Sequence, residues 1–376
     1  MKHKKKELKF FSFRKYLWFI GIVFALILLV NILSRLNVGF ANDFSTRIFP
    51  SLVKTVGAFF GLVPFSVIEI LIWLTAAVFI YCLVKLIVLL IIHHSKRERF
   101  IFFYKLKRYS MNLICIILIC ILIVSVNCGI HYNRLPFATC ANIKSTEHTE
   151  EKLLNLLALL VEDANSLSAE IPTDENGVFT TDRLNLPEES IDAMYSLEAE
   201  YPFMTDYYPT PKSIILSKGM SYTGTAGFYS PFTLEANYNS DMPDLELPYT
   251  ICHELAHISG FIHEDEANFI AYLACIRSDR PEFRYSGTVN VLIYVANAAY
   301  NNCDGIRYKE IISELNPQVS KDLADQSQYW RQFESPVMDT SETLNDTYLN
   351  VQGESEGVLR YDMVTELLMD YYSNII

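Results

Sequence analysis

The sequence predicts an α+β protein, in which an N-terminal region of three transmembrane helices precedes a mostly helical domain with a small mixed β-sheet. Three apolar runs of spanning length lie within residues 1–130, and helical patterns flank a Gly-, Thr-, Tyr- and Phe-rich segment at 219–239. The charge changes at the same place, from 17 Lys/Arg against 4 Asp/Glu in residues 1–130 to 14 against 39 in residues 131–376. A basic apolar part followed by an acidic part of mixed composition indicates a membrane anchor and an acidic globular domain.

The membrane region is expected to contain spans at about residues 16–33, 65–92 and 111–130. Each run can cross a hydrocarbon layer of about 30 Å as a helix. Basic residues gather before the first span and in loop 93–110, whereas the connection between the first two spans has few. The positive-inside rule therefore predicts a multi-pass protein of the cytoplasmic membrane, with the N-terminus inside and residues 131–376 outside.

The apolar connector at 48–62 has two possible structures, a packed connector or an interfacial helix on the membrane surface, and we favour the packed connector. The eight cysteines include no CxxC pair, and a bridge involving Cys140 or Cys303 is left open. The acidic charge of the large domain repels phosphate, so we expect no nucleic-acid partner.

The domain at 131–376 is expected to begin with helices, change to strands and return to helices. After a linker at 131–139, an apolar stripe predicts an amphipathic helix within 145–170, and Pro187 with two following acids starts a second helix. Residues 212–217 and 219–239 have β character. Further helices are expected at 246–259, 264–278, 284–302, within 317–350, and at 357–374.

The residues that indicate chemistry are His253, Glu254 and His257, which form an HExxH pattern in an apolar helical segment. Residues four apart share a helix face, so the two imidazoles can bind one metal ion. Glu254 lies beside them, where a carboxylate can take a proton from a metal-bound water. The pattern ends at Gly260, which can terminate the helix, and a second, acidic helix start follows.

That second helix begins Glu264-Asp265-Glu266-Ala267-Asn268. HExxH followed by a helix that opens E-x-x-A-N is similar to the gluzincin metallopeptidases. The resemblance implies that Glu264 is the third ligand of one Zn²⁺ and that Asn268 supports a histidine. Glu266 is the alternative ligand. Only six residues separate His257 from Glu264, fewer than in many gluzincins, so the turn at Gly260 must be tight.

Several further segments resemble a bacterial membrane family catalogued as domain of unknown function 3810. They are PFSVIEIL at 64–71, GFYSPFTLEAN at 227–237, the HExxH run with EDEANFIAYLAC, RYSG at 284–287 and VQGESEGVLRY at 351–361. This resemblance implies membrane spans that precede a zincin-like domain. It implies no substrate.

Two further elements are candidates for substrate handling. The segment 226–239 is either an edge strand that holds a peptide substrate by backbone pairing or an ordinary hairpin strand. Tyr285 either donates a hydrogen bond to the oxyanion of a tetrahedral intermediate or packs at a helix start.

The expected function is that of a membrane-anchored zinc metallopeptidase that cleaves a peptide or protein substrate outside the cytoplasmic membrane, with Glu254 as general base. One alternative is a non-catalytic zincin-like membrane module that binds a partner or senses an envelope signal. Another is hydrolysis of a non-peptide amide. The HExxH lies far beyond the last span in sequence, which argues against proteolysis within the membrane.

Overall fold

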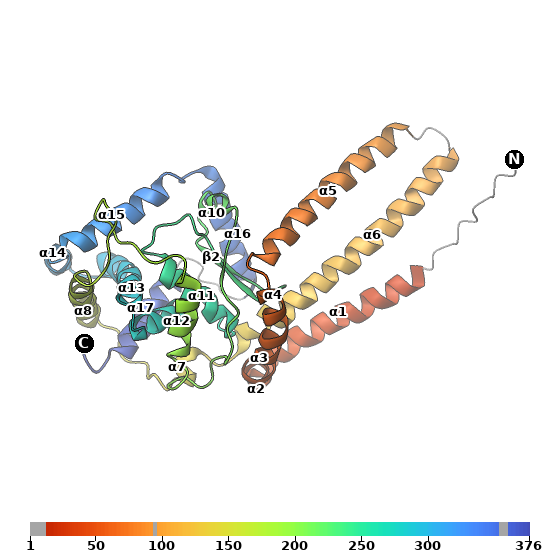
Figure 1. Ribbon diagram of the computed structural model, residues 1–376. Coiled ribbons are helices and arrows are strands. Elements are labelled where there is room, and N and C mark those ends of the chain that lie inside the picture. Colours follow the sequence, from red (N-terminus) through yellow and green to blue (C-terminus); the bar gives the residue numbers. More distant parts are fainter. Residues whose placement is uncertain (1–12, 93–95, 353–359) are drawn as a thin grey trace.

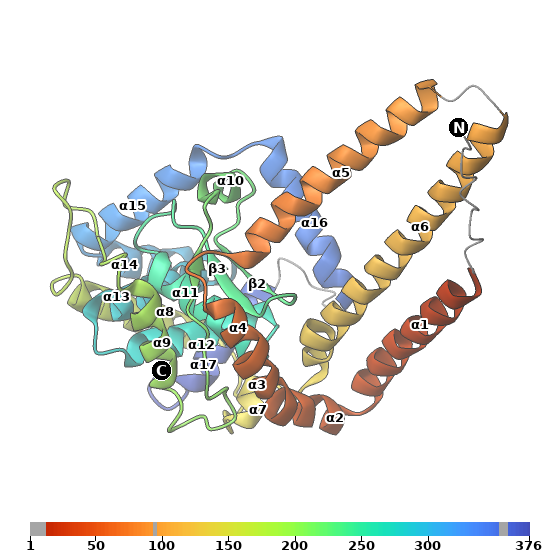
Figure 2. The same ribbon diagram turned by 45° about the vertical axis from the view of Figure 1, so that its right-hand side comes forward.

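The computed structural model describes residues 13–92, 96–352 and 360–376. Among these residues, three helices are long and apolar enough to cross a membrane, and most of their side chains are exposed, as expected for a protein in a bilayer. They are α1 (Phe13–Leu36), α5 (Val67–Ile92) and α6 (Lys96–Val124). All three project from the same end of the domain (Figures 1 and 2). The protein is therefore a membrane protein.

The third apolar helix differs from its prediction. Helix α6 begins at Lys96, so most of the predicted loop 93–110 is helical, in keeping with the good helix propensity of its Lys and Arg residues. The helix continues through a π-helical turn, Ser125–Gly129, and a short 3₁₀ turn, His131–Asn133, directly into the domain. The basic cluster before the first span lies outside the described residues.

The connector between the first two spans is helical and packed. It consists of α2 (Val38–Asp43), α3 (Phe49–Leu52) and α4 (Ala58–Gly61), joined by π-helical turns. Phe49 and Val53 are fully buried in the same hydrophobic core as the domain. The favoured packed connector is therefore confirmed, and the core crosses the boundary that the sequence predicts at residue 130.

The domain is mostly helical, as predicted. Helix α13 packs against α8 and α12, and α12 packs against α11 and α17 (Figure 1). These central helices are α8 (Glu150–Leu167), α11 (Leu247–Ile258), α12 (Glu264–Arg277), α13 (Pro281–Asn302) and α17 (Arg360–Tyr371). The remaining helices are α7 (Phe137–Cys140), α9 (Leu186–Tyr195), α10 (Ser217–Ser221), α14 (Gly305–Ser313), α15 (Pro317–Arg331) and α16 (Pro336–Gln352). Residues 353–359 of the expected C-terminal elements lie outside the described part of the chain.

A small mixed sheet completes the α+β fold. Its order is β1-β3-β2, with β3 parallel to β1 and antiparallel to β2. The strands are β1 (Lys212–Ser213), β2 (Gly227–Ser230) and β3 (Glu235–Tyr238). The expected strand 226–239 is thus a hairpin, because Leu234 turns the chain with a φ of 53°. Its first half, β2, lies at the edge of the sheet.

Candidate metal centre

The two histidines of the HExxH pattern share one face of α11. They are one helical turn apart, and their ring centroids lie 4.7 Å from each other. His257 is buried, and the side chain of His253 is only slightly exposed. Both imidazole rings are therefore close together and largely shielded from solvent.

The chain then turns sharply to bring a carboxylate to the same place. Gly260 has a φ of 77°, a left-handed conformation that glycine adopts without strain. Its missing Cβ also leaves room for His131, which a Cβ would approach to 2.9 Å. Glu264 follows as the first residue of α12, with Oε2 3.0 Å from Nε2 of His253 and Oε1 3.8 Å from Nε2 of His257.

Nδ1 of each imidazole has its own hydrogen-bond acceptor. Nδ1 of His253 lies 2.8 Å from Oδ1 of Asn268, and Nδ1 of His257 lies 2.7 Å from the carbonyl oxygen of Phe261. Both acceptors fix the Nδ1–H tautomer and leave Nε2 with its lone pair. Asn268 thus contacts a histidine of the pattern, as the resemblance to the gluzincins implies.

This donor set fits a zinc ion. One ligand atom from each of His253, His257 and Glu264 lies within 4.8 Å of the other two. Two neutral imidazoles and one carboxylate form the three-ligand set of a catalytic zinc site, which leaves a coordination position for water or substrate.

Protons compete with a metal for these groups. Burial raises the pKa of Glu264, but the hydrogen bond with His253 and the neighbouring charge of His257 outweigh it and lower the pKa to about 2. Burial alone lowers the pKa of His253, whereas its bond with Glu264 raises it to about 8. The cluster therefore attracts positive charge, which a proton supplies in the absence of a cation.

Glu254 lies beside the cluster but takes no part in it. Its side chain is buried, its Oε2 has no hydrogen-bond partner among the described residues, and burial raises its pKa to about 8. Strand β2 covers it closely, since a Cβ on Gly227 would lie 2.5 Å from its Oε1. A carboxyl group without a partner beside a metal position is suited to proton transfer.

Two other predicted site residues lie elsewhere. Glu266 points away from the histidines, and its carboxylate accepts a hydrogen bond from the backbone N–H of Phe137. Tyr285 is fully buried, and its hydroxyl donates to Oδ2 of Asp322 at 2.7 Å. Tyr285 therefore has the packing role at the start of α13, and the oxyanion role is not supported.

The cluster lies in a cleft of about 720 Å³ whose wall contains residues that sequence reasoning did not identify. Glu246 and Thr250 continue the face of His253 and His257 along α11, a spacing of i, i+4, i+7 and i+11 that the sequence already displays. Strand β2 and α13 line further parts of the cleft, with Tyr229 and Tyr294 among them. The role of Gly227 depends on long-range packing, whereas the Phe261 carbonyl lies only four residues beyond His257 and is placed by the turn at Gly260.

The fold and the site together define a membrane protein with a His-His-Glu cluster in a cleft of its globular domain. Residues 44–369 match the model of the family described as "Protein of unknown function (DUF3810)". The chain belongs to this family. No curated protein and no solved structure matches the chain.

Proposed function

We propose that this protein is a membrane-anchored zinc metallopeptidase that hydrolyses peptide bonds outside the cytoplasmic membrane. The observation that carries the proposal is the convergence of His253, His257 and Glu264, with the buried carboxyl of Glu254 beside them. A purely structural metal site has no use for a second carboxyl group, without a hydrogen-bond partner at Oε2 among the described residues, beside the three ligands.

Each residue then has a defined task. His253, His257 and Glu264 hold the zinc, and Asn268 keeps the first imidazole in the tautomer that binds metal. When bound, zinc supplies a Lewis acid that polarises the scissile carbonyl and increases the acidity of a water molecule. Glu254 takes the proton from the attacking water and delivers it to the leaving amine.

The edge strand gives the substrate a place to bind. Within the described part of the chain, strand β2 pairs with β3 on one side only, and it lines the cleft next to Glu254. An extended peptide can add to its free edge through main-chain hydrogen bonds, which orients the scissile bond without requiring a particular sequence.

The first test is the metal content of the full-length protein, purified in detergent. We expect one zinc ion per chain in the wild type and its loss in Glu264→Ala. Glu266→Gln is the matched control, because Glu266 lies on the same turn of α12 and bonds elsewhere, so its zinc is expected to remain. A wild-type protein that binds no zinc when zinc is offered would contradict the proposal.

The second test separates catalysis from metal binding. Glu254→Gln keeps the size of the side chain but removes the base, so we expect full zinc content and a loss of about 10²- to 10⁴-fold in the hydrolysis of a quenched fluorescent peptide library. Equal hydrolysis by the wild type and the variant would contradict the role of Glu254 as the base, and no hydrolysis by either would favour a non-catalytic protein.

A further inference from the structure

The strand that covers the candidate centre is bonded to the end of a membrane helix. Asn127, in the turn that follows α6, donates through Nδ2 to the carbonyl oxygen of Pro231 at 2.7 Å. Its own carbonyl oxygen accepts from the hydroxyl of Tyr229 in β2 at 3.0 Å. The ring of Tyr229 lies 6.3 Å from the ring of His257. The end of the third span is therefore connected to a candidate zinc ligand through two successive contacts, Asn127 with Tyr229 and Tyr229 with His257.

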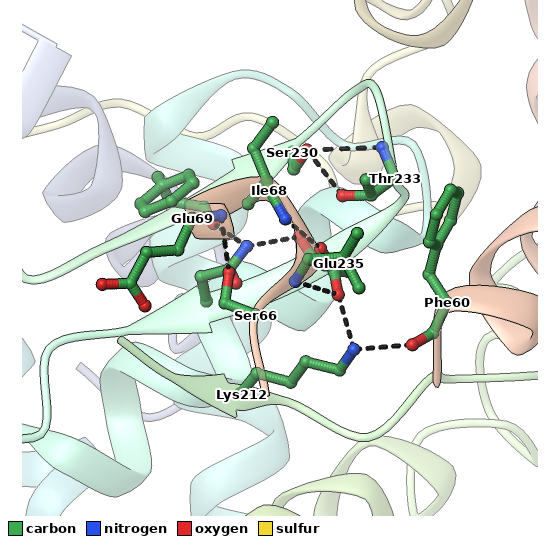
Figure 3. Close-up of polar contacts among 11 residues, drawn as sticks. Phe60, Ser66, Ile68, Glu69, Lys212, Ser230, Thr233 and Glu235 are labelled. Atoms are coloured by element: carbon green, nitrogen blue, oxygen red, sulfur yellow. Dashed lines mark hydrogen bonds and ion pairs between the residues drawn. The ribbon is translucent and has the colours of Figure 1, made fainter. Parts of the chain in front are cut away.

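The same sheet is bonded to the second span (Figure 3). Glu235 of β3 accepts from the backbone N–H groups of Val67 at 3.1 Å and Ile68 at 3.0 Å, in the first turn of α5. Lys212 of β1 forms a buried ion pair with the same carboxylate. A carboxylate is most stabilising at this position, because the N-terminus of a helix has free N–H groups and a partial positive charge.

A reciprocal contact holds α5 from its own side. Glu69, in its first turn, accepts from the backbone N–H groups of Ile215 at 2.8 Å and Leu216 at 3.0 Å, just after β1. Each element thus supplies a carboxylate for the backbone of the other. The sheet is fixed at the ends of both spans, and its distance from the bilayer is set by these bonds.

The cleft itself reaches the end of the third span. Cys128 and Tyr132 line it, and both lie in the last turns of the apolar helix that spans Phe102–Asn133. Tyr132 also packs edge-on against His263, the residue before Glu264, with 5.3 Å between ring centroids. One wall of the cleft is therefore built by the membrane anchor.

Exposed apolar side chains surround this end of the domain. They adjoin the bonds just described: two precede α5, two bond through their N–H groups to Glu69, and one follows Pro231. We call them the juxtamembrane rim: Leu62, Phe65, Ile215, Leu216 and Phe232. Apolar groups of this kind are stable where they meet the interfacial region of a bilayer.

We propose, on the basis of the peptidase function above, that the substrate is a polypeptide anchored in the same bilayer and cut within the first residues outside it. A chain paired with β2 lies beside the ends of α5 and α6, at the level where a neighbouring span leaves the membrane. An extended chain covers about 3.3 Å per residue, so a few residues beyond a span are enough to reach the cleft. Anchoring also raises the local concentration of the scissile segment.

The test uses the full-length protein reconstituted in liposomes. The probes are a randomised decapeptide library attached to a single apolar helix through Gly/Ser spacers of about 4, about 12 and about 40 residues, together with the free library. Confinement to the bilayer accelerates all anchored probes, so the dependence on spacer length is the informative readout. We expect cleavage, located by mass spectrometry, to be fastest with the shortest spacer and to require Glu254.

The outcomes separate the two proposals. Glu254-dependent cleavage that is as fast for the free library or the longest spacer as for the shortest overturns the anchored substrate and leaves the peptidase intact. No Glu254-dependent cleavage of any probe overturns the peptidase function, and with it this inference.

A second measurement does not depend on activity. With Trp18 and Trp73 of the spans changed to Phe and Trp330 kept as the same background in both variants, a tryptophan is introduced by Phe232→Trp in the rim or, as control, by Ile306→Trp in α14. Both positions are exposed, and α14 lies at the end of the domain away from the spans in both views. We expect brominated lipids to quench fluorescence in F232W only. Equal or absent quenching in F232W contradicts the juxtamembrane position.

Discussion

Gly227→Ala tests how closely the edge strand controls the carboxyl of Glu254, the proposed base. The added Cβ would lie 2.5 Å from Oε1, 2.8 Å from Cγ and 2.9 Å from Cδ of Glu254, whereas ordinary contacts begin at 3.4 Å. Oε1 must therefore move by about 0.9 Å, the difference between 2.5 Å and 3.4 Å. The φ of Gly227 is not positive, so alanine strains no backbone there. The effect acts through Glu254.

A misplacement of about 1 Å in a catalytic group can cost about 10²-fold in rate. We expect kcat/KM for peptide hydrolysis to fall by about that factor in G227A, with zinc content unchanged. Gly305→Ala is the matched control, because a Cβ at Gly305 meets nothing within 4 Å.

A double-mutant cycle makes the explanation specific. Glu254→Asp shortens the side chain and relieves the clash, so it should reduce activity less in the G227A background than in the wild type. If G227A retains wild-type activity while E254Q is inactive, the inferred displacement of Glu254 by the added Cβ is wrong. Strict additivity of the two substitutions would show that G227A acts elsewhere.

Three further predictions concern single groups. Asn268→Ala removes the acceptor of His253 and should weaken zinc affinity by about 10- to 100-fold, measured by competition with a chelator. Burial raises the pKa of Glu246 to about 7. The protonated carboxyl therefore contributes about 3 kcal/mol to the free energy of unfolding below pH 4.5, and this contribution is lost as the pH rises through 7. In Glu246→Gln, the thermal unfolding midpoint should lose this part of its pH dependence. Tyr285→Phe removes a hydrogen bond to Asp322 and should cost about 1.5–3 kcal/mol in unfolding free energy without lowering kcat, whereas an oxyanion role requires kcat to fall.

The parts of the site that sequence predicts are those set by local geometry. A helix puts residues i and i+4 on one face, so the pairing of His253 with His257 follows from spacing alone. Glu264 and Asn268 are assigned by resemblance to a known pattern, and the structure brings both to the histidines. The choice between Glu264 and Glu266 depends on which residue begins α12, because side chains two residues apart on one helical turn point in different directions.

The parts that sequence does not predict depend on contacts between distant segments. Nothing near Gly227 signals that its missing side chain makes room for Glu254. The hairpin at β2 and β3 has no Asn-Gly or Asp-Gly turn, so one long strand was an equally good interpretation. The connector is apolar enough for a membrane surface, and only the complete core shows what buries Phe49.

The membrane anchor is a structural part of the candidate enzyme. Phe49 and Val53 of the connector are fully buried in the domain core, and burial of such side chains contributes about 1.5–3 kcal/mol each. Domains of this kind have a total stability of only about 5–15 kcal/mol, so a fragment beginning at residue 131 would lose a large fraction of it. Because the anchor completes the core, donates hydrogen bonds to the sheet and lines the cleft, its position in the bilayer determines the orientation of the cleft. That coupling explains why a site far from the spans in sequence lies beside them in space.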